Sequence, residues 1–324
     1  MRPPRWLGRA VRAVFLLLAV TGLLLALRGQ GHAVWAATSR IGGLGVVGAF
    51  LAAAAGLGAS GLVWRALLAD LGSPLPVRTA GHVFFLGQLG KYLPGSVFAV
   101  AAQMELGRDQ GVARSRVASA GVVFMAVLVA TGLLVAAGTL PFASPHTVHR
   151  YGALLLALPV LLTCLAPPVL TRLLTLLLRA LRRPPMERSL TWVGVGRAFG
   201  WALVMWGCYG AHILLLVAPQ RHASGIALPV VALGGYALAW TAGFLVVVAP
   251  AGAGVREAAL ALALLPVLDR PAATAVAIVS RGLMTVGDLA WGGLGAAWRP
   301  VPTPIGPALG TVGGVQQLGK AAER

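Results

Sequence analysis

Five ionisable residues lie within long apolar stretches of this sequence: the cations Lys91, Arg256 and Arg281 and the acids Glu257 and Asp288. A charged side chain in such a stretch usually faces a cavity or a partner, because its burial in hydrocarbon is costly. Three cations would attract an anion such as a phosphate group, and the two acids could orient the arginines. The chemistry that these residues indicate first is therefore anion binding.

Two breaks rich in proline and glycine lie next to these charges. Pro94-Gly95 interrupts the apolar stretch 79–106, and the segment 250–254 (Pro-Ala-Gly-Ala-Gly) interrupts the stretch 227–268. Proline removes a backbone donor and glycine tolerates a sharp reversal of the chain. We therefore predict two re-entrant helical hairpins, which are tolerated at membrane depth only where they pack in protein or line a cavity.

The candidate substrate-binding residues gather around these two elbows. Ser96 can cap the half-helix that follows the first elbow. Arg256 and Glu257 begin the half-helix that follows the second, where free backbone amides carry partial positive charge. The full set predicted to bind substrate is Gln88, Lys91, Tyr92, Pro94, Gly95, Ser96, Gln103, Pro250, Gly252, Gly254, Arg256, Glu257, Arg281 and Asp288.

Each of these assignments has a structural alternative. Glu257 can pin the second elbow by pairing with Arg256 or Arg281. Arg281 and Asp288 are seven residues apart and share a helix face, so a mutual network that includes Glu257 is as consistent as a contact with substrate. Lys91 has no acid close to it in sequence and is therefore the strongest functional candidate.

The histidines and cysteines indicate no catalytic or metal centre. His82 and His212 stand alone in apolar stretches and are interpreted as hydrogen-bonded residues rather than ligands. Cys164 and Cys208 also lie in apolar stretches, without a CxxC spacing. We expect no metal ion, no cofactor and no catalytic residue.

The composition indicates the class of protein in which these residues lie. Of 324 residues, 58% are hydrophobic and 10% are charged, against about a quarter charged in an ordinary soluble domain. The net charge of +18 comes mostly from arginines in short gaps between apolar runs. That pattern is typical of membrane-flanking loops, whereas a nucleic-acid-binding protein gathers its basic residues on a polar surface. The sequence predicts an all-α integral membrane protein that binds no nucleic acid.

Six apolar stretches are close to the roughly 20 residues that a spanning helix requires. With the two hairpins they form two repeats of the order span, span, hairpin, span, at 1–150 and 151–298, which would insert in opposite senses. The tail 299–324 is expected to be disordered. The predicted spans are 10–27, 41–64, 117–140, 151–170, 198–218 and 272–298, and Leu128 in the third is expected to face lipid.

The distribution of basic residues tests this layout. Loops assigned to the cytoplasm hold 18 Lys and Arg, and the opposite loops hold 5. This asymmetry follows the positive-inside rule. We therefore expect a multi-pass protein of the plasma membrane with both termini in the cytoplasm, in which 10–27 is a retained first span rather than a cleaved signal peptide.

The residues at both elbows resemble a known family. The segment 90–97 (GKYLPGSV) resembles the GKYLPGS element of the membrane domain of lysylphosphatidylglycerol synthases, and 250–258 (PAGAGVREA) resembles their PGGxGxREA element. Ala251 stands where the family commonly has glycine. The resemblance covers roughly 10–298 and implies the lipid-translocating, flippase-like domain. Only 26 residues follow the last predicted span, so we expect a member that lacks the aminoacyl-transferase domain.

These observations lead to one function with alternatives left open. The protein is expected to translocate an anionic phospholipid, a modified phospholipid or a lipid-linked sugar, with membrane lipids as partners. A membrane enzyme or accessory subunit of lipid-linked glycosyl transfer is the first alternative, with a lipid-modifying enzyme or glycosyltransferase as partner. The loops 28–40 and 141–150 hold none of the acids that such an enzyme needs. The second is a proton-coupled small-solute transporter with Glu257 or Asp288 as carrier. Oligomerisation is left open.

Overall fold

A computed structural model describes most of the chain. Its described residues are 31–92, 97–143, 155–180, 188–220, 227–246 and 252–298. The predicted first span 10–27 and the tail 299–324 lie outside these ranges. So do four candidate site residues, which are Pro94, Gly95, Ser96 and Pro250.

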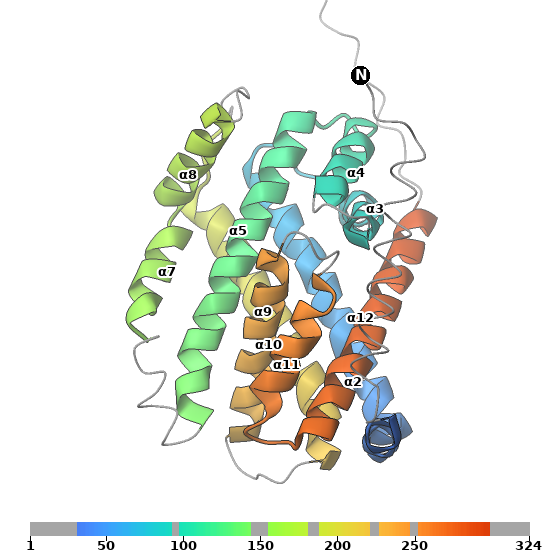
Figure 1. The fold of residues 1–324 in the computed structure, drawn as a ribbon. Helices are drawn as coiled ribbons and strands as arrows, with labels where there is room; N and C mark the ends of the chain where they lie inside the picture. The colour runs from blue at the N-terminus through green and yellow to red at the C-terminus, as the bar shows by residue number, and fades with distance from the viewer. Residues whose placement is uncertain are drawn as a thin grey trace, which may run out of the picture.

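Every regular element among the described residues is a helix, which confirms the predicted all-α class (Figure 1). The α-helices are α2 (Gly31–Asp70), α3 (Val77–Gln88), α4 (Val97–Arg108), α5 (Arg114–Thr139), α7 (Ala157–Leu165), α8 (Pro167–Ala180), α9 (Trp192–Val217), α10 (Ala227–Leu245), α11 (Val255–Leu264) and α12 (Arg270–Ala297). Short 3₁₀ segments are η1 (Leu89–Tyr92), η2 (Leu140–Ala143) and η4 (Ala218–Gln220).

Five helical stretches in the described part of the chain are long and apolar enough to cross a membrane. They are Ser39–Asp70, Arg114–Ala143, Trp192–Gln220, Ala227–Leu245 and Arg270–Ala297. Four of them contain most or all of a span predicted from the sequence. The predicted span 151–170 corresponds to α7 and α8, which together could form a sixth but are bent by 74°.

The two predicted hairpins correspond to the helix pairs α3–α4 and α10–α11. The members of each pair pack against one another, α10 and α11 running side by side in Figure 1. Helix α10 has 19 residues, enough for a full span, and is therefore longer than the half-helix that the sequence predicted. The re-entrant course of the hairpins and their opposite insertion stay predictions.

Glycines allow the close backbone contacts at both elbows. Gly252 and Gly254 have φ angles of 70° and 83°, a backbone region that residues other than glycine rarely adopt. A Cβ atom at Gly252 would lie 2.8 Å from the carbonyl oxygen of Gly243 on α10. A Cβ atom at Gly90 would lie 2.8 Å from the backbone nitrogen of Ala99 on α4. Larger residues at these positions would push the two arms of each hairpin apart.

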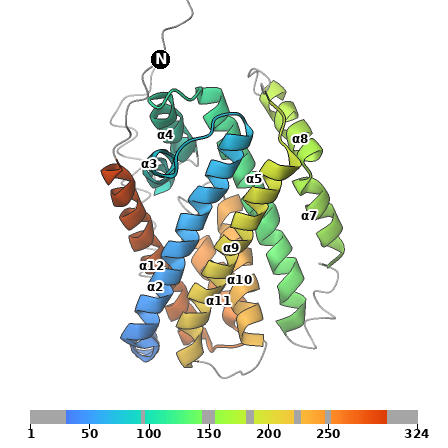
Figure 2. The same cartoon turned by 180° about the vertical axis from the view of Figure 1, so that it is seen from behind.

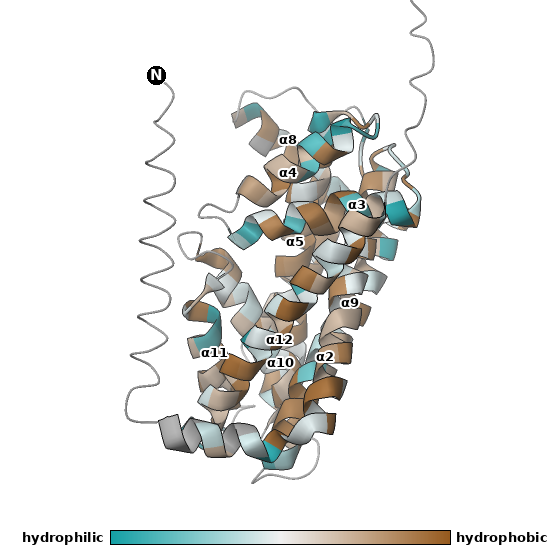
Figure 3. Ribbon diagram, turned by 90° about the vertical axis from the view of Figure 1, so that its right-hand side faces the viewer, coloured by the Kyte–Doolittle hydropathy of each residue, from teal (hydrophilic) through white to brown (hydrophobic). Residues whose placement is uncertain are grey.

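The core is formed where α2 packs against α9 and α12, as Figure 2 shows from behind. Trp64 and Trp206 are among its largest fully buried side chains. The indole of Trp206 donates a hydrogen bond of 2.9 Å to the hydroxyl of Thr131 on α5. Many large apolar side chains are also exposed, Leu44 at 92%. Figure 3 shows hydrophobic residues along much of the length of the helices. An exposed apolar surface of this extent suits contact with lipid tails rather than water.

One end of the molecule gathers the basic residues and is called the basic end below. It lies at the top of Figure 1 and contains the ends of α2, α4, α8 and α12 and the beginnings of α3, α5 and α9. The described arginines there are Arg65, Arg78, Arg108, Arg114, Arg116, Arg172, Arg179, Arg188 and Arg197, against Arg40 and Arg270 at the opposite end.

Polar contacts fasten the helices together at this end. The carboxylate of Asp70, at the end of α2, accepts hydrogen bonds from the backbone nitrogen and hydroxyl of Thr191 at 2.8 and 2.6 Å. Thr191 in turn caps α9 by accepting from the backbone nitrogen of Gly194. Between α4 and α5, Arg114 donates to Glu105 at 2.8 Å, and this hydrogen bond lowers the pKa of the Glu105 carboxyl.

Candidate functional site

A cavity of about 150 Å³ lies between the two hairpins, with α2, α5, α9 and α12 as its further walls. The polar or charged residues in its lining are Ser60, Gln88, Lys91, Tyr209, Arg256, Arg281 and Asp288. Apolar side chains from α5, α9 and α10 complete it, among them Phe124, Leu128, Met205 and Trp240. The cavity therefore combines a charged side with an apolar side.

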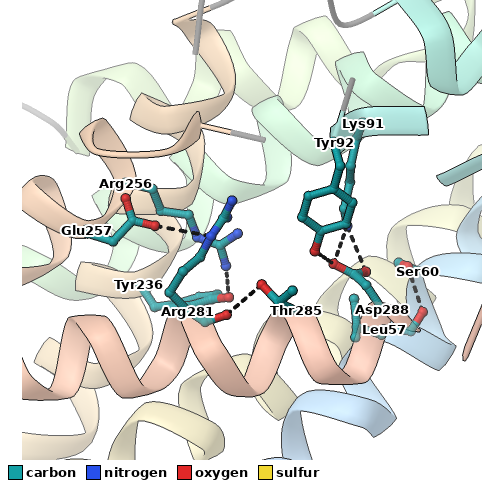
Figure 4. A network of polar contacts seen from close by, with 10 residues as sticks. All are labelled: Leu57, Ser60, Lys91, Tyr92, Tyr236, Arg256, Glu257, Arg281, Thr285 and Asp288. Atoms are coloured by element: carbon teal, nitrogen blue, oxygen red, sulfur yellow. Dashed lines mark hydrogen bonds and ion pairs between the residues drawn. The ribbon is translucent and has the colours of Figure 1, made fainter. Parts of the chain in front are cut away.

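Asp288 of α12 is the centre of one polar cluster in this lining (Figure 4). Lys91 of η1 places its Nζ 2.7 Å from both carboxylate oxygens, and Tyr92 donates its hydroxyl to Oδ2 at 2.6 Å. The carboxylate is 9% exposed and the Lys91 side chain 30%. The first hairpin is thus joined to the last span by an ion pair and a hydrogen bond on the same acid.

The second cluster lies at the beginning of α11. Arg256 donates to the hydroxyl of Tyr236 on α10, and its guanidinium carbon lies 4.9 Å from the centre of that ring. Oε2 of Glu257 accepts from the backbone nitrogen of Gly254 at 2.5 Å and so caps the helix. Oε1 of Glu257 lies 3.3 Å from Nε of Arg281 on α12. Both hairpins therefore have an ionic contact with α12.

These partners refine two interpretations made from sequence. Lys91 has no acid close to it in sequence, but Asp288, 197 residues later in the chain, pairs with it. Of the network considered for Arg281, Asp288 and Glu257, the pair of Arg281 with Glu257 is present, while Asp288 pairs with Lys91 on the first hairpin. Two residues seven apart on a helix lie about 10.5 Å apart along its axis, so each acquires a different neighbour. Of the two partners considered for Glu257, Arg281 is the one in contact.

The remaining candidates divide between the cavity and its surroundings. Gln88 and Gly252 line it. Gly254 lies outside the lining and contributes its backbone nitrogen, which donates to the capping carboxylate of Glu257. Gln103 is 3% exposed and packs against Gly87 between α3 and α4, away from the lining.

Leu128 is the clearest error of the sequence interpretation. It was expected to face lipid, but it is 3% exposed and lines the cavity. Helix α5 is apolar on all sides, so no periodicity in its sequence marks the face that packs inward.

Three polar residues of the site were missed from the sequence: Tyr209, which lines the cavity, and the two described next. Tyr236 is the partner of Arg256, and Ser60 lines the cavity while its hydroxyl donates to the carbonyl of Leu57 at 2.6 Å. A lone hydroxyl within an apolar helix is a weak signal, because it can always bond to its own backbone. Nothing else in the sequence distinguished these two residues.

His82 and His212 are both hydrogen-bonded, as the sequence interpretation expected. The ring of buried His212 bridges the carbonyl of Ala49 and the hydroxyl of Ser280, each at 2.9 Å. The ring of His82 lies 2.8 Å from the carbonyl of Gly295. These bonds join α9 to α2 and α12, and α3 to α12.

The charges around the cavity do not balance. Lys91 faces Asp288 and Arg281 faces Glu257, but among the described residues no carboxylate pairs with Arg256. Its partner is the neutral phenol of Tyr236. The lining holds three cations and one acid, and Glu257, outside the lining, faces Arg281, so Arg256 is the cation that no described carboxylate pairs with. It lies at the beginning of the α11 helix, where backbone amides add partial positive charge. This arrangement can hold an anion.

Comparison with protein families gives one match, to the family described as lysylphosphatidylglycerol synthase TM region, over residues 9–292. The matched residues include both elbow segments, 90–97 and 250–258, on which the resemblance was based. A search among curated proteins found no match.

Proposed function

The chain belongs to this lysylphosphatidylglycerol synthase TM-region family, and we propose that it is a flippase that moves an anionic lipid head group through the cavity between the two hairpins. The observation that carries the proposal is the position of Arg256. It lies in the lining of an internal cavity, at a helix beginning, with a neutral phenol as its hydrogen-bond acceptor. The substrate class is an anionic or modified phospholipid or a lipid-linked sugar.

The mixed lining of the cavity supports a lipid as the substrate. A head group needs polar contacts, which Arg256, Lys91 and Gln88 supply from the two hairpins. The glycerol and upper acyl chains need apolar contacts, which the α5, α9 and α10 side chains supply. Three methionines, Met125, Met205 and Met284, also line the cavity and can adapt to different shapes because their side chains are unbranched and flexible.

Competition for Lys91 provides a way to couple binding to movement. A phosphate on Arg256 that also reaches Lys91 would compete with Asp288 for the ammonium group. Loss of the Lys91–Asp288 pair would weaken the attachment of η1 and the first hairpin to α12, which would then depend on the Tyr92–Asp288 and His82–Gly295 contacts. A ligand can shift such an equilibrium only through a contact that differs between the two states, and this pair is that contact.

The basic end suggests how the protein is oriented in the membrane. We place it at the cytoplasmic face of the plasma membrane, with both chain termini on that side, because short cytoplasmic loops carry an excess of arginine and lysine. The protein would then meet anionic lipids of the inner leaflet at its basic end. A lipid-modifying enzyme or glycosyltransferase that supplies the substrate is the proposed partner.

A reconstituted flipping assay tests the function. Purified protein in liposomes would be given trace fluorescent phosphatidylglycerol, lysylphosphatidylglycerol, phosphatidylcholine or a polyprenyl-phosphate sugar, and a membrane-impermeant quencher would report the exposed fraction. We expect protein-dependent transfer of at least one of these lipids other than zwitterionic phosphatidylcholine, and slower transfer in Arg256→Gln. Transfer of no lipid tested, by a correctly inserted protein, would contradict the proposal.

The assay should also be run with and without a pH gradient. Asp288 lines the cavity and Glu257 adjoins it, so each is a candidate proton carrier. A gradient that drives uptake of a small solute without moving any lipid would favour the proton-coupled transporter instead.

A further inference from the structure

A second concavity lies on the outer surface of the bundle, separate from the cavity of the proposed function. It has a volume of about 300 Å³ and is bounded by α2, α3, α9 and α12. Its lining is almost wholly apolar, with Arg65 as its charged residue. Helix α2 separates it from the inner cavity, since Leu57 and Ser60 line the cavity, whereas Gly58 and Gly61 line this groove.

Small residues on α2 form the floor of the groove. Ala55, Gly58, Ala59 and Leu62 recur at the spacing of one helix face, and Arg65 continues that face toward the basic end. Side chains of this size leave a depression between the neighbouring helices. Because α2 and α9 are both candidate spans, the depression lies at a depth where the surroundings are hydrocarbon.

The tryptophan walls of the groove are held in place by the fold. Trp291 donates its indole N–H to the carbonyl of Ala54 at 2.8 Å and stacks on Phe85 with ring centres 4.4 Å apart. Trp298 lies against Gly81 of α3, where a larger residue would collide with its ring. Trp201 of α9 forms the opposite wall. The groove is therefore formed before any occupant arrives, which lowers the entropic cost of binding.

Two arginines stand near the basic end of the groove, Arg65 in its lining and Arg197 beyond the lining on α9. Nε of Arg65 donates to the carbonyl of Leu75 at 2.8 Å, which fixes the side chain and leaves its terminal nitrogens for another acceptor. Arg197 is exposed and precedes Trp201 by one helical turn on α9, on the side of the basic end. Within the described ranges, neither arginine pairs with a carboxylate. An apolar groove thus ends at two cations without acids.

We propose that this groove binds an anionic phospholipid of the leaflet at the basic end, as a resident lipid distinct from any transported one. One acyl chain lies along α2 between the tryptophans, and the phosphate is bound by Arg65 and Arg197. Charge complementarity selects this occupant. A spanning helix from a second copy of the chain would fill the apolar part, but the acids within the five candidate spans, Asp70 and Asp288, are already engaged by Thr191 and Lys91. The inference does not depend on the proposed transport function.

Photo-crosslinking distinguishes these occupants. Full-length protein would be reconstituted with phosphatidylglycerol or phosphatidylcholine carrying the same diazirine-labelled acyl chain, and adducts would be mapped by mass spectrometry. We expect phosphatidylglycerol to label α2 and α9 segments of the groove more than phosphatidylcholine does. The expected preference is about fivefold for each arginine, from about 1 kcal/mol per basic residue at a membrane surface.

Charge variants and a blocking variant make the test specific. Arg197→Gln breaks no contact described in the structure, so it should leave the fold intact and lower the preference; Arg65→Gln with Arg197→Gln should abolish it. Arg172→Gln with Arg179→Gln, at the same end on α8, is the matched control and should change nothing. Ala55→Leu should reduce labelling of the groove by both lipids.

Three results would overturn the inference. Equal labelling of the groove by the two lipids would mean that it holds annular lipid without recognising a head group. A preference that survives the double arginine variant would place the anion site elsewhere. A groove without lipid adducts but with cross-links between two chains would assign it to a second copy.

Discussion

Lys91 and Asp288 are 197 residues apart in the chain, yet the Lys91 ammonium lies 2.7 Å from each oxygen of the Asp288 carboxylate. Tyr92 donates to the same carboxylate. The first hairpin is thereby attached to α12, and the ion pair between Arg281 of α12 and Glu257 reaches the second hairpin. Helix α12 is therefore the element through which the two hairpins are coupled.

The coupling predicts a non-additive pair of substitutions. Lys91→Met or Asp288→Asn alone should each lower the free energy of unfolding by up to about 3 kcal/mol, because one buried charge is left without its partner. Lys91 is partly exposed, so the loss should fall at the low end of the range for buried pairs. The double variant should lose less than the sum, measured by denaturant titration in mixed micelles.

Tyr92→Phe is the control for this cycle. It removes a hydrogen bond to the same carboxylate without removing a charge, and should cost about 1 kcal/mol. If the losses from Lys91→Met and Asp288→Asn simply add, the two residues do not interact in the membrane-extracted protein.

Arg256 is predicted to be the main anion-binding residue. Arg256→Gln should slow lipid transfer by about 10- to 100-fold, since a hydrogen bond to a charged group contributes about 1.5–3 kcal/mol. Arg256→Lys keeps the charge and should retain part of the rate. The rate at which labelled lipid becomes protected from the impermeant quencher in liposomes measures transfer by both variants.

The matched control for Arg256 is Arg270→Gln. Arg270 also stands in the first turn of a helix, but it is exposed at the end of the bundle opposite the basic end. Its substitution should leave transfer unchanged. Normal transfer by Arg256→Gln would mean that the cavity does not bind its substrate through this cation.

Glu257 is predicted to be a scaffold residue rather than a ligand. Glu257→Gln removes the charge that faces Arg281 but keeps an oxygen that can cap Gly254, so it should lower unfolding free energy by about 3 kcal/mol. Glu257→Ala should cost a further ~1 kcal/mol through loss of the cap. Thermal unfolding of both variants in detergent shows whether Glu257→Ala is less stable than Glu257→Gln.

A proton carrier at Glu257 would behave differently from a scaffold. Glu257→Gln would then unfold like the unsubstituted protein but lose the dependence of transport on a pH gradient. That pattern would replace the scaffold interpretation.

Local features of the sequence were sufficient to predict most of the described helices and the breaks that separate α3 from α4 and α10 from α11. Proline and glycine within apolar runs act on their own backbone, so segments such as 90–97 and 250–258 carry their signal in a few neighbouring residues. Lys91, Arg256 and Arg281 lie in apolar stretches, which indicated that they would face a common interior. The energetic cost of placing a charge in hydrocarbon was enough to predict that part of the site.

The pairing of those charges could not be read from sequence. Whether Asp288 meets Arg281 or Lys91 depends on how α12 is rotated and on how deeply η1 enters the bundle. Both are set by packing between helices that are apolar on most faces, such as α5, where Leu128 lines the cavity instead of facing lipid. Tertiary packing of this kind leaves no periodicity for a single sequence to display.

Membrane topology is open to a direct labelling test. In a background with Cys164→Ala and Cys208→Ala, Ser115→Cys and Ser189→Cys near the basic end should react only with reagent supplied from the cytoplasm. Ser144→Cys and Ala223→Cys, outside the described residues, should react only from the other side. Reaction of Ser115→Cys from outside would mean that the first hairpin crosses fully, and the inverted repeat would then be wrong.

Solvent access to the cavity between the hairpins gives the last prediction. Gly252 is a poor position for a cysteine, because a Cβ there would lie 2.8 Å from the carbonyl oxygen of Gly243. Ser60 lines the cavity and differs from cysteine by one atom, so Ser60→Cys should preserve the fold and react with small water-soluble thiol reagents. Leu51→Cys, on the same helix but 61% exposed on the apolar surface, should stay unreactive in liposomes. Saturating phosphate-bearing lipid should slow the reaction of Ser60→Cys, whereas no reaction from either side would exclude a water-filled path past Arg256.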